Sequence, residues 1–126
     1  MGISIKRVYE PPDKKDGYRV LIDRLWPRGM KKEDAGIDEW VKEIAPSNEL
    51  RKWYNHDPSK WEEFKRRYFG ELECRRDAVE KLVRRVSKDT VTFLFSSKEV
   101  KLNNAVALKE YIETKLRSNE YSKCQN

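Results

Sequence analysis

Cysteine, histidine and glycine are scarce in this sequence of 126 residues, and each shortage argues against a class of site. Cys74 and Cys124 do not form a CxxC pair, and with a single histidine a zinc site is not expected. No GxGxxG or GxxxxGK loop is present to cradle a phosphate with backbone N–H groups. The sequence therefore predicts no metal and no cofactor.

Long apolar runs are also missing. No segment approaches the length of a membrane span, and residues 1–10 lack the apolar region of a signal peptide. The two cysteines are explained most simply as reduced thiols. We therefore expect a cytoplasmic protein that does not contact a membrane.

Charge is what the sequence has in abundance. Charged residues make up 40% of the chain against 37% hydrophobic residues, with 28 basic and 22 acidic side chains, for a net charge of +6. This excess favours anionic partners but falls short of the dense basic stripe of a dedicated nucleic-acid binder. The length suits one domain, and the sequence leaves the oligomeric state open.

The hydrophobic pattern predicts an α/β fold. Strands are expected at residues 3–10, 18–26 and 90–97, which are rich in β-branched, aromatic and aliphatic residues. Helical spacing follows over residues 37–47, 48–57, 58–74, 75–88 and 103–117. We expect one domain over residues 1–116, with a small, mainly parallel sheet of three or more strands packed by helices, and a flexible tail over residues 117–126.

The second strand has a continuous apolar run, Val20–Leu21–Ile22, which indicates that both faces of this strand are covered. About nine residues separate it from the first strand, too few for a helical crossover. Either the two strands pair as a hairpin or they are not neighbours in the sheet.

The stretch DRLWPRG, residues 23–29, directly follows this apolar run. If the strand alternates, Asp23 lies at the edge of an apolar face, where a carboxylate needs a partner. Arg24, Arg28 and Arg19 are the local candidates. Such an ion pair would either fix the loop or orient a guanidinium towards an anionic substrate, since the arginine fork matches phosphate and carboxylate.

The stretch FSSKEVKLNN, residues 95–104, follows the last strand and leads into the last helix. Ser96 and Ser97 end the strand, and either Asn103 or Asn104 is a plausible N-cap. The positive end of that helix would favour an anion, as in phosphate sites of α/β folds. An ordinary capped loop explains the pattern equally.

Two aromatic side chains, one between these stretches and one within the first, are further candidates. His56, the single histidine, is either a general acid or base or a surface residue beside the helix start at Asp57 and Pro58. Trp26 leaves a strand among charges, so it could form the wall of a pocket, whereas Trp40 and Trp53 fall on helical apolar faces.

These segments together resemble the YeaO-like branch of the DUF488 family over about Lys6 to Ile112. The specific stretches are DRLWPRG, APSNELRKW and HDPSKWEEFKRRY, with Asn104 and Ala105 matching the opening of the final helix. The resemblance implies a small cytosolic prokaryotic α/β protein and no particular activity. Wider relatives carry a Cys-His-Arg element after the last core strand, and residues 96–104 contain none of these three residue types, so thiol chemistry is not carried over.

We therefore predict a small-molecule site at the carboxyl ends of the strands that binds a phosphorylated or nucleotide-like anion, in a binding protein or a hydrolase or group-transfer enzyme. The alternative is a non-enzymatic nucleic-acid-binding or regulatory module. Asp23 and His56 are the candidate catalytic residues. The candidate ligand-binding residues are Arg24, Trp26, Arg28, Arg51, Ser96, Ser97 and Asn104.

Overall fold

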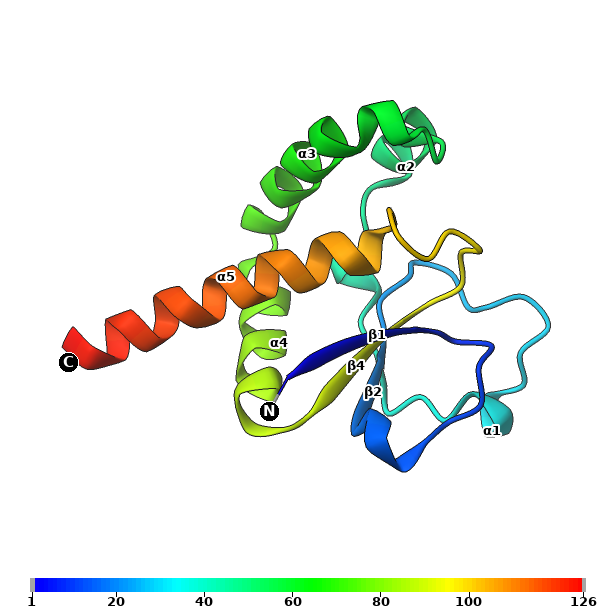
Figure 1. The fold of residues 1–126 in the computed structure, drawn as a ribbon, viewed down its shortest axis with the longest axis horizontal. Helices are drawn as coiled ribbons and strands as arrows, with labels where there is room; N and C mark the ends of the chain where they lie inside the picture. The colour runs from blue at the N-terminus through cyan, green and yellow to red at the C-terminus, as the bar shows by residue number, and fades with distance from the viewer. Residues whose placement is uncertain (1, 126) are drawn as a thin grey trace.

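A four-stranded parallel sheet forms the centre of the fold (Figure 1). The computed structural model describes residues 2–125, with side chains described to Ser118. The strands are β1 (Ile3–Arg7), β2 (Tyr18–Leu21), β3 (Glu39–Trp40) and β4 (Val91–Phe95). Their order is β1-β4-β2-β3, and every neighbouring pair is parallel. Because β4 lies between β1 and β2, these two strands are not neighbours in the sheet, which was the second of the two expected arrangements.

The three longest helices pack together on one side of this sheet. The helices are α1 (Lys32–Ala35), α2 (Asn48–Tyr54), α3 (Trp61–Glu73), α4 (Arg76–Lys88) and α5 (Asn104–Gln125). Single 3₁₀ turns occupy Lys14–Asp16, Lys42–Ile44 and Pro58–Lys60. Helix α5 contacts β1 and β4, and α3 and α4 contact α5. This is the predicted α/β class, in one domain.

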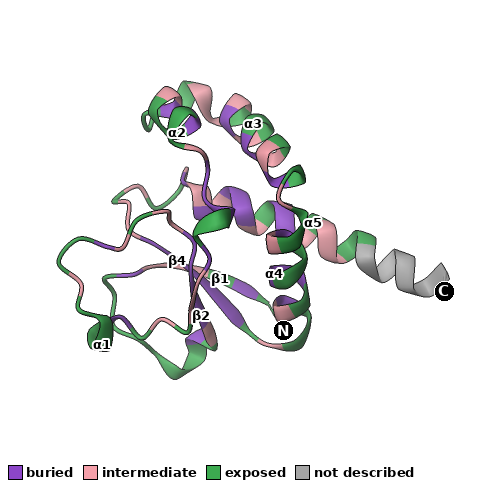
Figure 2. Cartoon of the chain, turned by 180° about the vertical axis from the view of Figure 1, so that it is seen from behind, coloured by how far each residue is buried: buried purple, intermediate pink, exposed green. Residues whose placement is uncertain are grey.

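Both faces of the sheet are covered, as the apolar run in β2 predicted. Val20 and Ile22 belong to the main core, between the sheet and the helices. Leu21 points to the opposite face, where it packs with Val8 and Leu94 in a second, smaller core. Figure 2 shows the buried strands between the helices and the long loops that close this second face.

The predicted helix over residues 37–47 is wrong. The segment instead forms the short strand β3 and then a 3₁₀ turn. Its apolar side chains serve two cores, because Trp40 packs in the smaller core and Val41 and Ile44 are buried in the main one. Pairing of its backbone with β2 therefore decides its structure, and the helical spacing is coincidental.

Three of the other expected helices are confirmed to within a few residues at their ends, and the last one begins as expected but ends eight residues later than residue 117. Asp57 caps the turn at Pro58 by accepting a hydrogen bond from the Ser59 N–H at 3.0 Å, and α3 follows. Helix α5 runs to Gln125, and the flexibility expected for residues 117–126 lies largely outside the described side chains. In the described part of the chain, no helix has the length and apolar character needed to cross a membrane.

Candidate functional site

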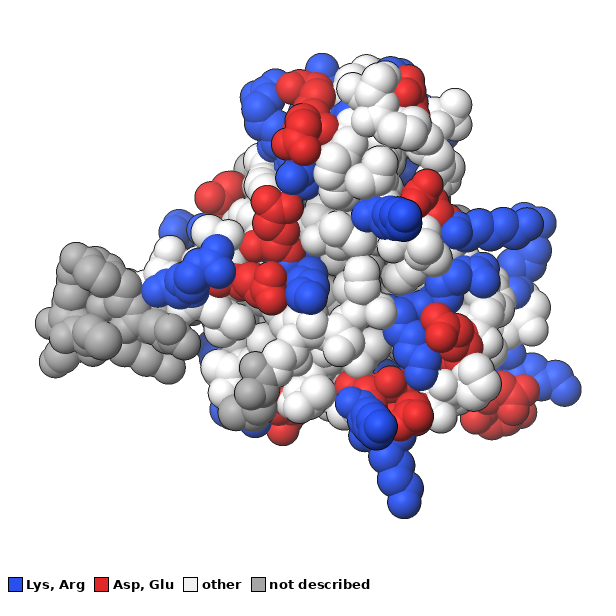
Figure 3. Space-filling view, viewed as in Figure 1, with Lys and Arg blue, Asp and Glu red and all other residues white. Residues whose placement is uncertain are grey.

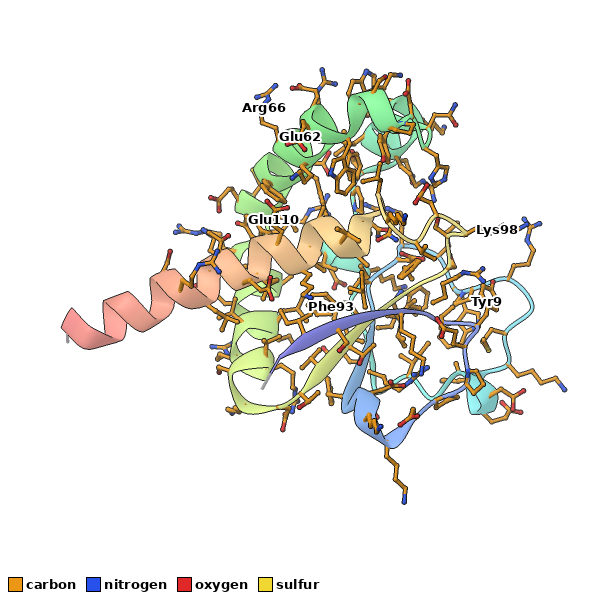
Figure 4. All side chains as sticks on the ribbon, viewed as in Figure 1. Tyr9, Glu62, Arg66, Phe93, Lys98 and Glu110 are labelled. Atoms are coloured by element: carbon orange, nitrogen blue, oxygen red, sulfur yellow. The ribbon has the colours of Figure 1, made fainter. Side chains whose placement is uncertain are left out.

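A cleft of about 840 Å³ opens at the carboxyl edge of the sheet. It is bordered by the loops that follow β1, β2 and β4 and by helix α2, because parallel strands end at the same edge. Figure 4 shows Tyr9 and Lys98 at this edge. All nine site residues named from the sequence line this one cleft: Asp23, Arg24, Trp26, Arg28, Arg51, His56, Ser96, Ser97 and Asn104. Their roles in binding or catalysis stay predictions.

Asp23 ties together the loops on either side of the cleft. One carboxylate oxygen accepts hydrogen bonds from the Ser96 N–H (2.9 Å) and hydroxyl (2.8 Å). The other accepts a hydrogen bond from the Asn104 side-chain amide at 3.1 Å. We expected an arginine partner for Asp23, and this expectation is wrong, because no arginine among the described residues pairs with it. Arg19 instead forms a buried ion pair with Asp16.

Arg24 lines the cleft, and one N–H group of its guanidinium has no hydrogen-bond partner. Its Nη2 donates a hydrogen bond to the Pro46 carbonyl at 3.2 Å. Its Nε is buried and has no hydrogen-bond partner, the single such side-chain nitrogen or oxygen in residues 2–118. A buried N–H group without an acceptor is unusual in folded proteins and calls for an explanation.

The loop that accepts the Arg24 guanidinium, residues 43–47, is itself held by α3 and the residues just after it. Tyr68 and Arg75 donate hydrogen bonds to three of its carbonyls, each at 2.6 Å. Glu71 accepts hydrogen bonds from the N–H and hydroxyl of Ser47, at 2.8 and 2.5 Å. Tyr68 and Glu71, three residues apart, project from one side of α3, and Arg75 follows two residues after the helix ends.

Positive side chains dominate the charge of the cleft. Besides Arg24, the exposed side chains of Arg28, Arg51 and Lys98 line it. Among the described residues, no carboxylate comes within ion-pairing distance of these four. Figure 3 shows blue side chains gathered at the edge of the molecule where Lys98 and Tyr9 lie in Figure 4.

Glu99 is the second carboxylate of the cleft, after Asp23. Hydrogen bonds from the N–H groups of Lys101 (2.9 Å) and Leu102 (3.2 Å) lower the pKa of this carboxyl group, and nearby His56 adds to the effect. Glu99 is therefore ionised at neutral pH, and its carboxylate binds backbone N–H groups of its own loop. His56 has a left-handed backbone, with φ of 54°.

Aromatic rings supply the apolar part of the cleft wall. Tyr54 and Phe64 are stacked with their centroids 4.3 Å apart. Trp26 packs edge-on against Trp40, at 5.5 Å between centroids, and its indole N–H donates to the Met30 carbonyl at 2.7 Å. Trp26 is therefore fixed in place as a wall residue.

The loop after β4 is a capped strand-to-helix loop. Asn103 is the N-cap of α5, because its side-chain oxygen accepts a hydrogen bond from the Val106 N–H at 3.0 Å. This leaves Asn104 free to bind Asp23. Among the described residues, no three His, Cys, Asp or Glu side chains are grouped to hold a metal ion.

Sequence reasoning missed two residues at the end of β1 that shape the cleft, Arg7 and Tyr9. Arg7 donates hydrogen bonds to the carbonyls of Ser97 (2.9 Å) and Ser96 (3.2 Å), which fixes the loop after β4. The Tyr9 hydroxyl donates to the Arg28 carbonyl at 2.9 Å. Arg7 ends β1 and Tyr9 follows it by two residues, so the argument applied to DRLWPRG would have found them.

Fold and site together define a small α/β protein with a cationic cleft at the strand ends. The chain belongs to the family whose model is described as "Inactive DUF488-N3 subclade", which matches residues 2–126. It is 41% identical to uncharacterized protein YeaO of Escherichia coli K12 over 114 residues, 90% of this chain and 99% of that protein. It is also 38% identical to uncharacterized protein Rv3073c of Mycobacterium tuberculosis over 110 residues, 87% and 92% of the two chains. No solved structure matches the chain.

Proposed function

We propose that this protein binds a phosphorylated or nucleotide-like small anion in the strand-end cleft. The buried, unpartnered Nε of Arg24 is the observation that carries this proposal. A buried donor without an acceptor costs free energy, so a turn of the Arg24 side chain that brings its Nε N–H to an anion in the cleft would be favoured. Arg28, Arg51 and Lys98 would add charge around the same ligand.

The size and composition of the cleft support a ligand with a flat ring as well as an anionic group. About 840 Å³ falls within the range of small-molecule sites. The stacked rings of Tyr54 and Phe64 are almost fully buried and back the cleft, whereas the partly exposed Trp26 offers an aromatic surface to a ligand. Aromatic surface beside guanidinium groups suits a nucleotide or a similar phosphorylated molecule.

Binding is better supported than catalysis. Both oxygens of Asp23 already accept hydrogen bonds, so this carboxylate is engaged as a structural tie. The description of the family as an inactive subclade points the same way. Hydrolysis or group transfer would require a general base. With Asp23 engaged, the exposed His56 is the remaining candidate in the cleft.

A thermal-shift screen of nucleotides, sugar phosphates and short oligonucleotides tests the proposal. The variants are Arg28→Ala in the cleft and Arg84→Ala, an exposed arginine on α4 that removes the same charge elsewhere. A ligand at 100 times its Kd should stabilise the wild type and Arg84→Ala by about 2.7 kcal/mol, and Arg28→Ala by less.

Two results would contradict the proposal. One is the absence of any small-molecule ligand across the screen. The other is stabilisation by oligonucleotides alone, sensitive to salt and equal in both variants, which would favour the nucleic-acid-binding alternative.

A further inference from the structure

We infer that the anionic group recognised in the cleft is a dianionic phosphomonoester, selected over singly charged phosphodiesters. The inference rests on the proposed function and narrows its ligand class. Four positive side chains, those of Arg24, Arg28, Arg51 and Lys98, line the cleft, and the carboxylates there are Asp23 and Glu99. Four positive charges against two negative ones leave an excess of two, with His56 counted as neutral.

Neither carboxylate neutralises a cleft cation directly. The oxygens of Asp23 accept hydrogen bonds from Ser96 and Asn104, which are neutral groups. Glu99 accepts backbone N–H groups of its own loop. The acidic residues therefore act as ties within the protein, and the four cations have no carboxylate partner among the described residues.

An excess of two positive charges matches a phosphomonoester. Such a group carries nearly two negative charges above its second pKa of about 6, on three terminal oxygens. A phosphodiester carries one charge on two free oxygens, so one positive charge in the cleft would stay uncompensated. Arg24 adds a directional preference, because its unpartnered Nε N–H needs an acceptor that a third terminal oxygen can supply.

The same contrast separates a small ligand from a nucleic-acid strand. Every internal phosphate of a strand is a diester, whereas a mononucleotide or sugar phosphate ends in a monoester. The inference therefore predicts that internal phosphates of RNA or DNA are poor occupants of the cleft, whatever the overall positive charge of the protein.

The test compares matched ligands by isothermal titration calorimetry on the full chain, at pH 8.0 and constant ionic strength. The first set is adenosine 5′-monophosphate, its 5′-methyl phosphodiester and adenosine 5′-sulfate. The sulfate keeps three terminal oxygens but carries one charge, so it separates charge from shape. Ribose 5-phosphate and its methyl phosphodiester form a second set without the base, and inorganic phosphate is measured alone.

In at least one set, we expect the phosphomonoester to bind about tenfold more tightly than its methyl ester. In the adenosine set, the monophosphate should also bind about tenfold more tightly than the sulfate. Arg28→Gln should reduce this preference to about threefold or less, while Arg84→Gln should leave it unchanged. Arg28 is exposed, so its replacement is compatible with folding, which far-ultraviolet circular dichroism checks.

The outcomes distinguish the inference from the proposed function. Equal affinities for the monoester and the diester, or for adenosine 5′-monophosphate and adenosine 5′-sulfate, overturn the inference and leave the proposed anion site in place. A preference that Arg28→Gln does not alter also overturns it, because the charge excess would then not be its cause. No binding in either set or of inorganic phosphate contradicts both the inference and the proposed function.

Discussion

At the residue scale, Asp23 explains why an apolar strand runs directly into charge. Its carboxylate joins the end of β2 to Ser96 after β4 and to Asn104 in the first turn of α5. Three segments far apart in the sequence therefore depend on one side chain for their relative position. The charge at the end of this strand is needed to assemble the edge of the sheet where the cleft lies.

Replacing Asp23 with Ala should destabilise the fold by about 2 kcal/mol or more. Alanine removes both acceptor oxygens and leaves the N–H and hydroxyl of Ser96 and the Asn104 amide without their partner at partly buried positions. Urea unfolding measures the change. Asp77→Ala, which removes an exposed carboxylate on α4, is the control and should have little effect. Equal stability of the two variants would show that the tie contributes nothing.

Asp16 is a buried carboxylate held by two cations, Lys6 at 3.0 Å and Arg19. Burial alone would raise its pKa. Hydrogen bonds from Lys6, the Asp13 N–H and Arg19 outweigh burial, so the pKa lies below the usual 3.8. A carboxyl group with a lowered pKa stabilises the fold above its unfolded pKa, and this contribution is lost as the pH falls through its folded pKa.

Asp16→Asn should therefore cost about 3 kcal/mol at pH 7, because it leaves a buried arginine without its counter-ion. Below pH 3.8 the difference in unfolding free energy between wild type and variant should shrink. Urea titrations of both proteins between pH 7 and pH 2.5 measure it. A difference that stayed constant across this range would contradict a lowered pKa at Asp16.

At the element scale, α3 and the residues just after it support the loop at residues 43–47, which has little regular structure of its own. Tyr68, Glu71 and Arg75 bind five backbone or hydroxyl groups of that loop. The helical spacing of Tyr68 was visible in the sequence as part of an apolar stripe. Its second role, as a donor to a carbonyl across the fold, was not, because the partner lies 24 residues away.

Tyr68→Phe should destabilise the protein by about 1–3 kcal/mol, since it leaves the Ile44 carbonyl buried without its donor. Tyr111→Phe is a matched control. That hydroxyl bonds to Glu73, which water can solvate, so the loss should stay below about 1 kcal/mol. Guanidinium unfolding of the two variants gives the comparison, and equal losses would contradict the proposed role of the loop carbonyl.

How far the sequence predicts this protein depends on whether local or distant contacts decide each element. The apolar run in β2 and the cap at Asp57 are local signals, and both predictions were correct. The segment at residues 37–47 failed because its pairing partner, β2, lies about 20 residues earlier. The candidate cleft residues could be named from strand ends, but the partners of Asp23 could not, because Ser96 and Asn104 lie more than 70 residues away.

At the scale of the whole molecule, which carries a net charge of +6, the basic side chains differ in whether a carboxylate lies beside them. On α3 the arginines have internal partners: hydrogen bonds from Arg66 and Arg67 lower the pKa of Glu63 to about 2. Lys65 likewise lies near Glu62 and Glu110. Cations with no carboxylate partner among the described residues also lie outside the cleft, Arg84 on α4 among them. In the cleft, four of them line one cavity, which is a small target for a nucleic-acid backbone.

Single-stranded oligonucleotides that bind in the cleft alone should show a shallow salt dependence, because only four cations line it. If the four cleft cations make the phosphate contacts, log K should fall with log salt concentration with a slope of about −3. Binding over the whole basic surface would contact more phosphates and give a steeper slope. Fluorescence anisotropy of a labelled 12-mer between 50 and 300 mM salt measures it. Arg28→Ala should make the slope shallower by about 0.7, whereas Arg84→Ala should not change it, and a slope much steeper than −3 would favour the molecule-wide surface over the cleft.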